Sequence, residues 1–388
     1  MQRIPESVLT IATVGAIACA ISACAGGSSP DQRDGTIRLV EEQTYGRSEG
    51  SEEYLLGGVM AAAAAEDGHL VIAEANRLRV FAPDGSFLSY VGTPGEGPGE
   101  FMRVISVDVR DDHIVAFDQN RQRIIRYAFD GAFDGSAPFG PSSHAFWMAS
   151  TDRALIIAAT RPDSTGERFA GPFLQMVDDD LRVTESFGSM DLVYDLDDPY
   201  QRRLASETLS LNGAGSGNRV AFAPDHHWCR VAVYTLAQSG SRSGLTSDPT
   251  LLESDNCEND PVQIITEEQY NVYRELMPDR SDQVPGSLRA SFGPDGGTFS
   301  LVTRASSGLF YLSDGSLVQF VRNYDDGWHR FAERYAPDGA YVGRYNVEGF
   351  PDARWVSFMD KAGDDKVYLY VTLPDGSPTI KRYGVVVE

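Results

Sequence analysis

The sequence is poor in basic residues, with 33 lysines and arginines against 56 aspartates and glutamates and a net charge of −23. A chain this acidic repels nucleic acid and anionic lipid headgroups, so we expect no nucleic-acid partner. Long hydrophobic runs are also missing, because the apolar run from Val8 to Ala20 is shorter than the ~20 residues that span a bilayer. The hydrophobic content of 42% is nevertheless that of an ordinary globular protein, which excludes general disorder.

Residues 1–23 have the composition of a bacterial targeting segment rather than of a folded domain. Arg3 gives a thin positive start, the apolar run follows, and small residues precede a cysteine. Residues 21–24 (ISAC) resemble the lipobox of bacterial lipoproteins, which implies that Cys24 becomes the lipidated N-terminus after cleavage. Two alternatives stay open: a poorer register that ends at Cys19, and an ordinary secretory signal cut just before Cys24.

Residues 24–35 are small and polar, which predicts a flexible tether between the anchor and the fold. The lipoprotein resemblance implies a bacterial, extracytoplasmic protein of the cell envelope. No aspartate follows Cys24 directly, and by the same resemblance this favours the outer membrane or a position facing the periplasm. Because the acidic chain does not attract anionic lipid, we expect the lipid anchor alone to hold it at the membrane.

Cysteines are few as well, and only two of the four lie outside the targeting segment and its anchor. Cys229 and Cys257 would reach a compartment in which disulfides form. A bridge between them would close a loop of about 29 residues and stabilise the fold by ~3 kcal/mol in the chain-entropy picture. Two buried free thiols are the alternative.

Residues 69–92 (HLVIAEANRLRVFAPDGSFLSYVG) form the stretch around which the chain is organised. The pattern predicts three short strands at 69–75, 77–81 and 86–91. The turn at 83–85 (PDG) has the residues of a hairpin. Proline presets φ, aspartate accepts a local backbone bond, and glycine takes the left-handed conformation.

The same pattern returns about 44 residues later, a spacing typical of propeller blades. His113, Asn120-Arg121 and Asp130-Gly131 repeat the features of the first copy. The link between the copies reads G-x-G-P-G-E-F at 95–101. This link, the later N-R-x-R-[VI] strand and the D-G turn resemble the NHL repeat over about residues 57–135, and the resemblance implies a β-propeller.

We therefore expect an all-β fold, a single propeller of six four-stranded blades that covers residues 36–388. The lone strand at 36–45 is expected to close the last blade, because a ring of blades must hide its two edges. After the two clear repeats, the later blades are expected at 145–187, 208–265, 290–345 and from 355 onward.

One short helical insertion is expected near 266–277. Thr266 is a good N-cap, acidic residues follow in the first turn, and Pro278 ends the segment. The middle of the chain is less regular than the two clear repeats, so five or seven blades stay open as alternatives to six.

Three residues are candidates for a metal site. His69 and His113 occupy equivalent repeat positions, and blades related by rotation would place them in one ring near the axis. Some NHL-like proteins are lyases that cleave amidated-peptide precursors and hold zinc on central histidines, so the resemblance implies this possibility. The histidine positions of those lyases cannot be matched to residues of this sequence. Asp197 lies in an acidic run that could serve an axial calcium ion. The simpler interpretation is blade-turn residues and solvated turns, so we predict no cofactor, with calcium or zinc as the alternative.

Other motifs favour structural roles. His226 and His227 are adjacent and would point to opposite sides of a strand, so they do not share one ion easily. The run at 178–180 (DDD) lacks the spacing of a calcium loop. Five arginines recur in the repeats and either tie blade edges or form an anion site: Arg77, Arg79, Arg121, Arg123 and Arg126. No nucleophile elbow or phosphate-binding loop is present, and no catalytic residue is predicted.

Two functions follow from these observations. The first is a non-enzymatic, monomeric module that docks a protein, peptide or glycan on its exposed loop face and reaches the membrane through its lipid anchor. The alternative is a metal-dependent propeller lyase or lactonase with a cation on the axis. Fold alone decides neither, because propellers host both.

Overall fold

The computed structural model describes residues 34–139, 144–162, 169–188, 211–224, 229–237, 249–255, 262–266, 298–302, 304–323, 330–351, 355–362, 365–373 and 375–388. Within these residues every regular element is a strand except one 3-10 turn, η1 (Glu52–Tyr54). None of the same residues forms a helix long and apolar enough to cross a membrane.

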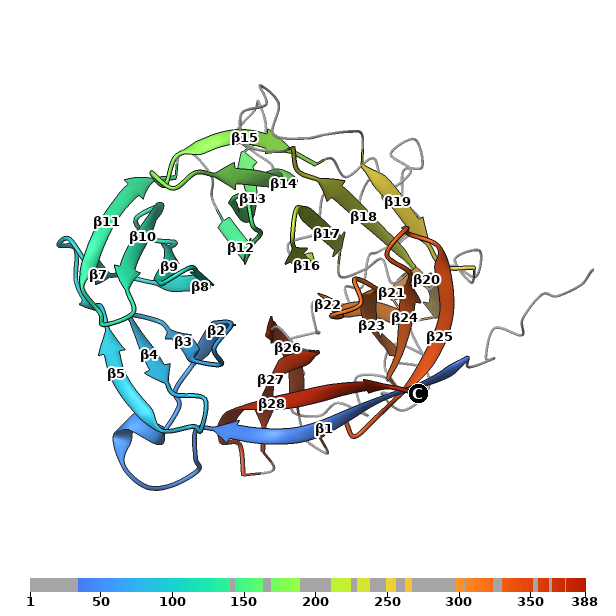
Figure 1. The fold of residues 1–388 in the computed structure, drawn as a ribbon, viewed down its shortest axis with the longest axis horizontal. Coiled ribbons are helices and arrows are strands. Elements are labelled where there is room, and N and C mark those ends of the chain that lie inside the picture. Colours follow the sequence, from blue (N-terminus) through green and yellow to red (C-terminus); the bar gives the residue numbers. More distant parts are fainter. Residues whose placement is uncertain are drawn as a thin grey trace, which may run out of the picture. The chain divides into compact units, whose positions relative to one another are not determined.

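Six antiparallel blades of four strands are arranged in a ring, with the first strand of each blade nearest the centre (Figure 1). Blades 1 and 2 are β2 (Val59–Ala64), β3 (Leu70–Glu74), β4 (Arg77–Phe81), β5 (Phe87–Val91), and β8 (Val104–Arg110), β9 (His113–Asp118), β10 (Arg123–Ala128), β11 (Phe133–Pro138). Blades 3 and 4 are β12 (His144–Ser150), β13 (Leu155–Pro162), β14 (Phe169–Val177), β15 (Val183–Phe187), and β16 (Leu211–Ser216), β17 (Arg219–Pro224), β18 (Arg230–Thr235), β19 (Thr250–Glu253). Blades 5 and 6 are β22 (Arg304–Tyr311), β23 (Leu317–Asn323), β24 (Arg330–Tyr335), β25 (Tyr341–Glu348), and β26 (Trp355–Ala362), β27 (Lys366–Thr372), β28 (Pro378–Val387), β1 (Gly35–Tyr45). The prediction of an all-β propeller with six four-stranded blades is confirmed.

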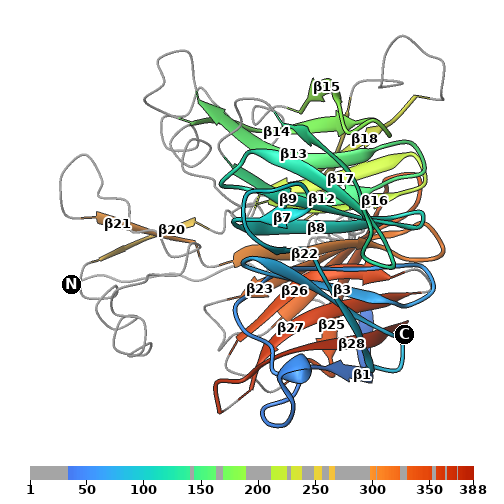
Figure 2. The same cartoon turned by 90° about the vertical axis from the view of Figure 1, so that its left-hand side faces the viewer.

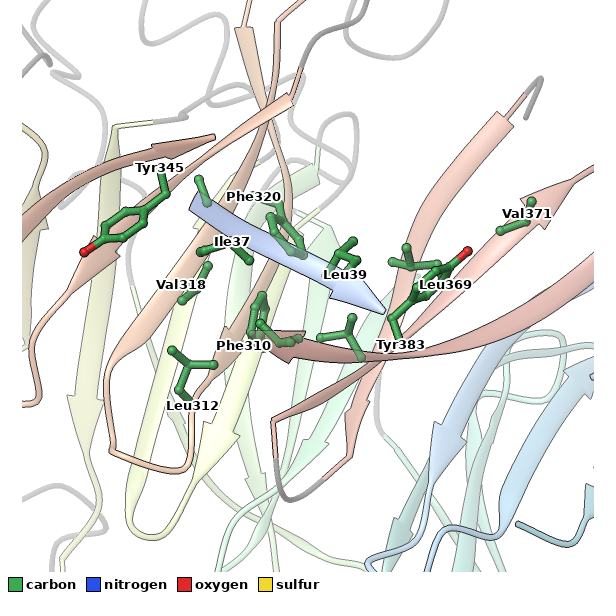
Figure 3. Packing of buried hydrophobic residues seen from close by; sticks show 13 residues of the cluster. Ile37, Leu39, Phe310, Leu312, Val318, Phe320, Tyr345, Leu369, Val371 and Tyr383 are labelled. Carbon is green, nitrogen blue, oxygen red and sulfur yellow. The ribbon is translucent and has the colours of Figure 1, made fainter. Parts of the chain in front are cut away.

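Strand β1 joins the two ends of the unit. It runs antiparallel to β28, and its first residues run parallel to β25, so blades 5 and 6 form one eight-stranded sheet. Figure 1 shows this blue strand beside the red β28. Ile37 and Leu39 alternate with exposed residues and are buried in a cluster that includes Phe310 of β22 and Tyr383 of β28 (Figure 3). The N-terminal strand therefore supplies both the backbone edge and part of the core that closes the ring.

Apolar side chains fill the space between neighbouring blades. Val71 of β3 packs with Val107 of β8 and Ile114 of β9, which joins blade 1 to blade 2. Ile156 of β13 packs with Val220 of β17 in the same way between blades 3 and 4. The second strands β3 and β9 are covered on both sides, so they have runs of buried residues rather than a strict alternation.

The chain between blades 4 and 5 departs from the prediction. β20 (Val262–Thr266) and β21 (Thr298–Val302) form a separate two-stranded sheet, which Figure 2 shows away from the blades. The predictions that 261–265 completes blade 4 and that 298–303 opens blade 5 are therefore wrong. The error arises because the first strand of blade 4, β16 (LNGAGS), consists of small residues that do not predict a strand. Without β16, the pattern assigns later strands to blade 4 in its place. The predicted helix near 266–277 lies outside the described residues, apart from Thr266, which ends β20.

We call the turn between the first and second strands of a blade its AB turn. In blades 1 to 4 they are residues 65–69, 111–112, 151–154 and 217–218. The glycine-rich link between blades 1 and 2 forms β6 (Thr93–Pro94) and β7 (Glu100–Phe101), a short parallel pair. This link connects blades 1 and 2. No helix follows it in the described residues, so it is not a dinucleotide-binding loop.

Candidate functional site

A groove of about 930 Å³ runs across blades 1 to 4. Its walls are chiefly the AB turns that follow β2, β8, β12 and β16, the strands nearest the centre in Figure 1. Leu88 of β5 and the turn of Phe129 and Asp130 in blade 2 add an outer wall. Cavities of this size bind small ligands or the side chains of a docked peptide.

Carboxylates dominate the lining of the groove. Seven acidic residues face one arginine and one histidine there: Glu66, Asp67, Asp108, Asp111, Asp112, Asp130 and Asp152, with Arg110 and His69. Among the described residues, Glu66, Asp112 and Asp152 have no lysine, arginine or histidine within ion-pair distance, whereas Asp67 and Asp111 do. A cleft lined by charge of one sign focuses the field, so this groove attracts cations.

Asp108 is the most buried of these carboxylates and lies on an inner strand. It is 7% exposed, and the Ser150 hydroxyl of the next blade donates a hydrogen bond of 2.6 Å to its Oδ2 atom. In blade 1 the equivalent register position holds Ala63, which is fully apolar. Burying a carboxylate costs desolvation free energy that an alanine avoids, so its place in the groove indicates a role beyond packing.

His69 and Phe129 form an aromatic wall between blades 1 and 2. Their ring centroids are 5.7 Å apart, and the His69 Nδ1 atom lies 2.8 Å from Asp67 Oδ1. Burial opposes ionisation of Asp67, but hydrogen bonds from the side chain and backbone of His69 outweigh it and lower the pKa of Asp67. The carboxylate therefore stays charged in mildly acidic solution. Leu88, beside this wall, keeps 51% of its surface exposed.

The AB turn of blade 2 is conformationally strained. Asp111 has a φ of 52°, a left-handed conformation that an aspartate adopts at a cost. The neighbouring Arg110 is mostly buried, and its Nη1 atom lies 3.0 Å from Asp179 Oδ1 in blade 3. The one guanidinium in the lining is thus engaged by an acidic residue that does not line the groove.

The two repeat histidines do not converge. His69 lines the groove, whereas the His113 Nε2 atom lies 3.3 Å from Asp134 Oδ2 on the outer strand of its own blade. No group of three histidines, cysteines, aspartates or glutamates in the described residues could hold a metal ion. His69 and His113 therefore do not form part of one metal-binding ring. Asp197, the third candidate, lies outside the described residues.

The repeat arginines contact acidic and polar groups within the blades. Arg77 and Arg79 both bind Glu74, Arg126 binds Asp134, and Arg123 donates to Ser136. Likewise, Asp178 accepts the Arg182 backbone N–H in a tight turn of blade 3. These contacts give Arg77, Arg79, Arg123, Arg126 and Asp178 structural roles.

The predicted cysteine sites are partly visible. Cys229 is buried and disulfide-bonded. Its expected partner, Cys257, lies outside the described residues, so the pairing stays a prediction. Cys24 and the rest of the targeting segment also lie outside them, and lipidation stays a prediction too.

The groove cannot be recognised in the sequence because its residues are spread over four blades. The AB turns of blades 1, 2 and 3 have the composition of ordinary acidic hairpins, and only the ring places Glu66, Asp112 and Asp152 along one groove. One signal was available: three successive repeats place acids at the same turn. Asp108 and Ser150 gave no signal, since single polar residues on strands are common.

Comparisons with known proteins support the fold. The profile of a family described as "6-bladed beta-propeller" matches residues 45–157. No curated protein matches the chain. The match covers blades 1 and 2 and the start of blade 3, so it agrees with the two clear repeats.

Three solved structures are similar in fold. A Bacteroides fragilis protein described as exported is 13% identical, with a TM-score of 0.50 over 92% of this chain and 97% of that one. A DUF4221 family member from Bacteroides vulgatus is 11% identical, with a TM-score of 0.48 over 92% and 100%. A PQQ-bound aldose sugar dehydrogenase from Streptomyces coelicolor is 13% identical, with a TM-score of 0.47 over 92% and 100%. At 13% identity the Bacteroides fragilis structure shows the fold alone, and no inference rests on the other two.

Proposed function

We propose that this protein is a membrane-anchored, extracytoplasmic binding module whose partner docks in the groove of blades 1 to 4. The observation that carries the proposal is the groove itself: about 930 Å³, lined by turns from four blades and by seven carboxylates, of which Glu66, Asp112 and Asp152 have no ion-pair partner among the described residues. Such a surface on a rigid ring of blades is typical of a docking site, because the scaffold fixes the turns.

The described residues favour binding over chemistry. The histidines that a metal-dependent lyase or lactonase would bring to the axis take different places, His69 in the groove and His113 on its own blade.

The place where β1 begins is compatible with the anchor. The Thr36 N–H donates to the Glu388 carbonyl, and the Val385 N–H donates to the carbonyl of Asp365, beside the AB turn of blade 6. A lipid at Cys24 would therefore hold the protein through the segment that precedes β1.

Site-specific photo-crosslinking in cells of the native host tests the docking proposal. A photoreactive residue replaces Leu88 in the groove or, as a control, Val342 on the outer strand of blade 5, which is 42% exposed and lies outside the groove. We expect a discrete adduct from position 88 and none from position 342. Equal labelling at both positions, or none at either, would refute a docking site in the groove.

Membrane fractionation tests the anchor separately. We expect the wild-type chain in the membrane fraction, labelled by a fatty-acid analogue, and Cys24→Ser in neither state. A Cys24→Ser protein that remains membrane-bound and labelled would contradict the assignment of Cys24.

A further inference from the structure

We infer that the groove takes a basic polypeptide segment, in which lysine or arginine side chains alternate with an aliphatic or aromatic one. This inference rests on the proposed function and names its ligand class. It combines three features of the groove: unpaired carboxylates on its walls, an apolar patch at its outer end, and a buried carboxylate on an inner strand.

Three carboxylates of the groove have no ion-pair partner among the described residues, and no three acidic residues in that part of the chain form a group that could hold a metal ion. Glu66, Asp112 and Asp152 belong to the AB turns of blades 1, 2 and 3, and all three are exposed. A single metal ion would need its ligands within one coordination sphere, whereas an extended chain with several cationic side chains could meet each turn in succession. Charge complementarity therefore favours an elongated cationic ligand.

The apolar patch separates a peptide from a simple polyamine. Leu88 is half exposed beside the edge-to-face pair of His69 and Phe129. A polyamine would satisfy the carboxylates and leave Leu88 in water. A peptide with an aliphatic or aromatic side chain between its basic residues would cover Leu88 as well, which adds hydrophobic burial to the electrostatic attraction.

The buried carboxylate offers a site for one basic side chain. Asp108 lines the groove together with two small residues, Ala64 of β2 and Ala149 of β12. The aliphatic stem of a lysine or arginine can lie along such a surface while its charged head reaches the carboxylate. The hydrogen bond from Ser150 holds that carboxylate in place.

Fluorescence anisotropy with the purified full-length protein tests the inference. The probe is a labelled decapeptide of alternating lysine and leucine, compared with a lysine–serine and a glutamate–leucine decapeptide. We expect the lysine–leucine peptide to bind best and the glutamate–leucine peptide not to bind. Raising the salt from about 50 mM to about 300 mM should weaken binding, because exposed charges are screened.

Matched variants separate the groove from general acidity. The variant Glu66→Gln/Asp112→Asn/Asp152→Asn should weaken lysine–leucine binding about tenfold. The control Glu49→Gln/Asp255→Asn/Glu348→Gln removes the same charge from exposed residues outside the groove and should change it less than about twofold. Equal losses in both variants would overturn the inference, since any acidic surface would then suffice.

Leu88→Ser distinguishes a peptide from a polyamine-like ligand. It should lower lysine–leucine binding to the level of the lysine–serine peptide. If the two peptides bind equally and Leu88→Ser has no effect, the ligand is a simple cation and the inference falls. If no basic peptide binds while the position-88 crosslink persists, the ligand class is wrong and the docking site stands. If both fail, the proposed function falls too.

Discussion

Arg79 and Glu74 form a buried ion pair between neighbouring strands of blade 1. The Arg79 Nε atom lies 2.8 Å from Glu74 Oε2, and the two residues are 1% and 6% exposed. The Arg79 guanidinium also donates to the carbonyls of Glu52 and Leu55, while the Gly57 N–H donates to Glu74. The pair therefore fastens the segment between β1 and β2 to the first blade.

Arg79→Met should lower the free energy of unfolding by about 3 kcal/mol, measured by urea denaturation. The substitution leaves Glu74 buried with only Arg77 beside it and removes the donors for two carbonyls. Arg182→Met is the control, because its ion pair with Asp180 is mostly exposed and should contribute less than about 0.5 kcal/mol. Similar losses of unfolding free energy in the two variants would show that the buried pair contributes no more to stability than an exposed one.

Acid should destabilise the wild-type protein more than Glu74→Gln. Burial opposes ionisation of Glu74, but the hydrogen bonds from Arg79, Gly57 and Arg77 outweigh it and lower its pKa in the folded state. Below the ordinary glutamate pKa of about 4.3, the unfolded chain binds the proton more readily, so stability falls as the pH drops toward the lowered value. Urea midpoints between about pH 6 and pH 3 should therefore fall more steeply for the wild type. Parallel curves would contradict the assignment.

Ile37→Ala should destabilise the closed ring by about 2 to 4 kcal/mol. Ile37 of β1 is fully buried in the cluster of blades 5 and 6 that Figure 3 shows, and its truncation leaves a cavity there. Val40→Ala on the same strand is the control, because Val40 is 45% exposed and should cost less than about 1 kcal/mol. A small effect of Ile37→Ala in thermal or urea unfolding would mean that β1 packing does not limit ring stability.

Asp111→Gly should stabilise the protein by about 0.5 to 1 kcal/mol, because glycine adopts a left-handed φ without the steric cost of an L side chain. Asp112→Gly, one residue later and without a positive φ, should instead destabilise it by about the same amount through the added freedom of the unfolded chain. Unfolding midpoints of the two variants measure the difference. The same sign for both would show that the turn is unstrained.

Cys257→Ser should lower stability by about 3 kcal/mol and leave one reactive thiol at Cys229 in the denatured protein. Cys229 is disulfide-bonded and buried, and Cys257 is the partner that the sequence offers outside the targeting segment. Peptide mapping under non-reducing conditions should recover the 229–257 pair. Recovery of Cys257 as a free thiol would assign the bridge to another cysteine.

The local architecture of the first two blades can be recognised from the amino-acid pattern alone. The alternating apolar residues of 69–92, their return near His113, and the Pro83-Asp84-Gly85 turn act over a few residues, so no tertiary contact is needed to recognise them. The strands β3, β4 and β5 lie where this pattern places them. The residues of β16 do not have the pattern of a strand, so the strands predicted for blades 4 and 5 are displaced by one.

The roles of residues at equivalent repeat positions depend instead on how the blades pack. His69 and His113 have the same repeat position, yet one faces Phe129 of the next blade and the other Asp134 of its own. The groove arises in the same way, because acidic turns far apart in sequence become neighbours when the blades pack around the centre. A local pattern fixes a strand and its turn, but the neighbours across the blade interface are set by long-range packing, and those neighbours determine the chemistry of the site.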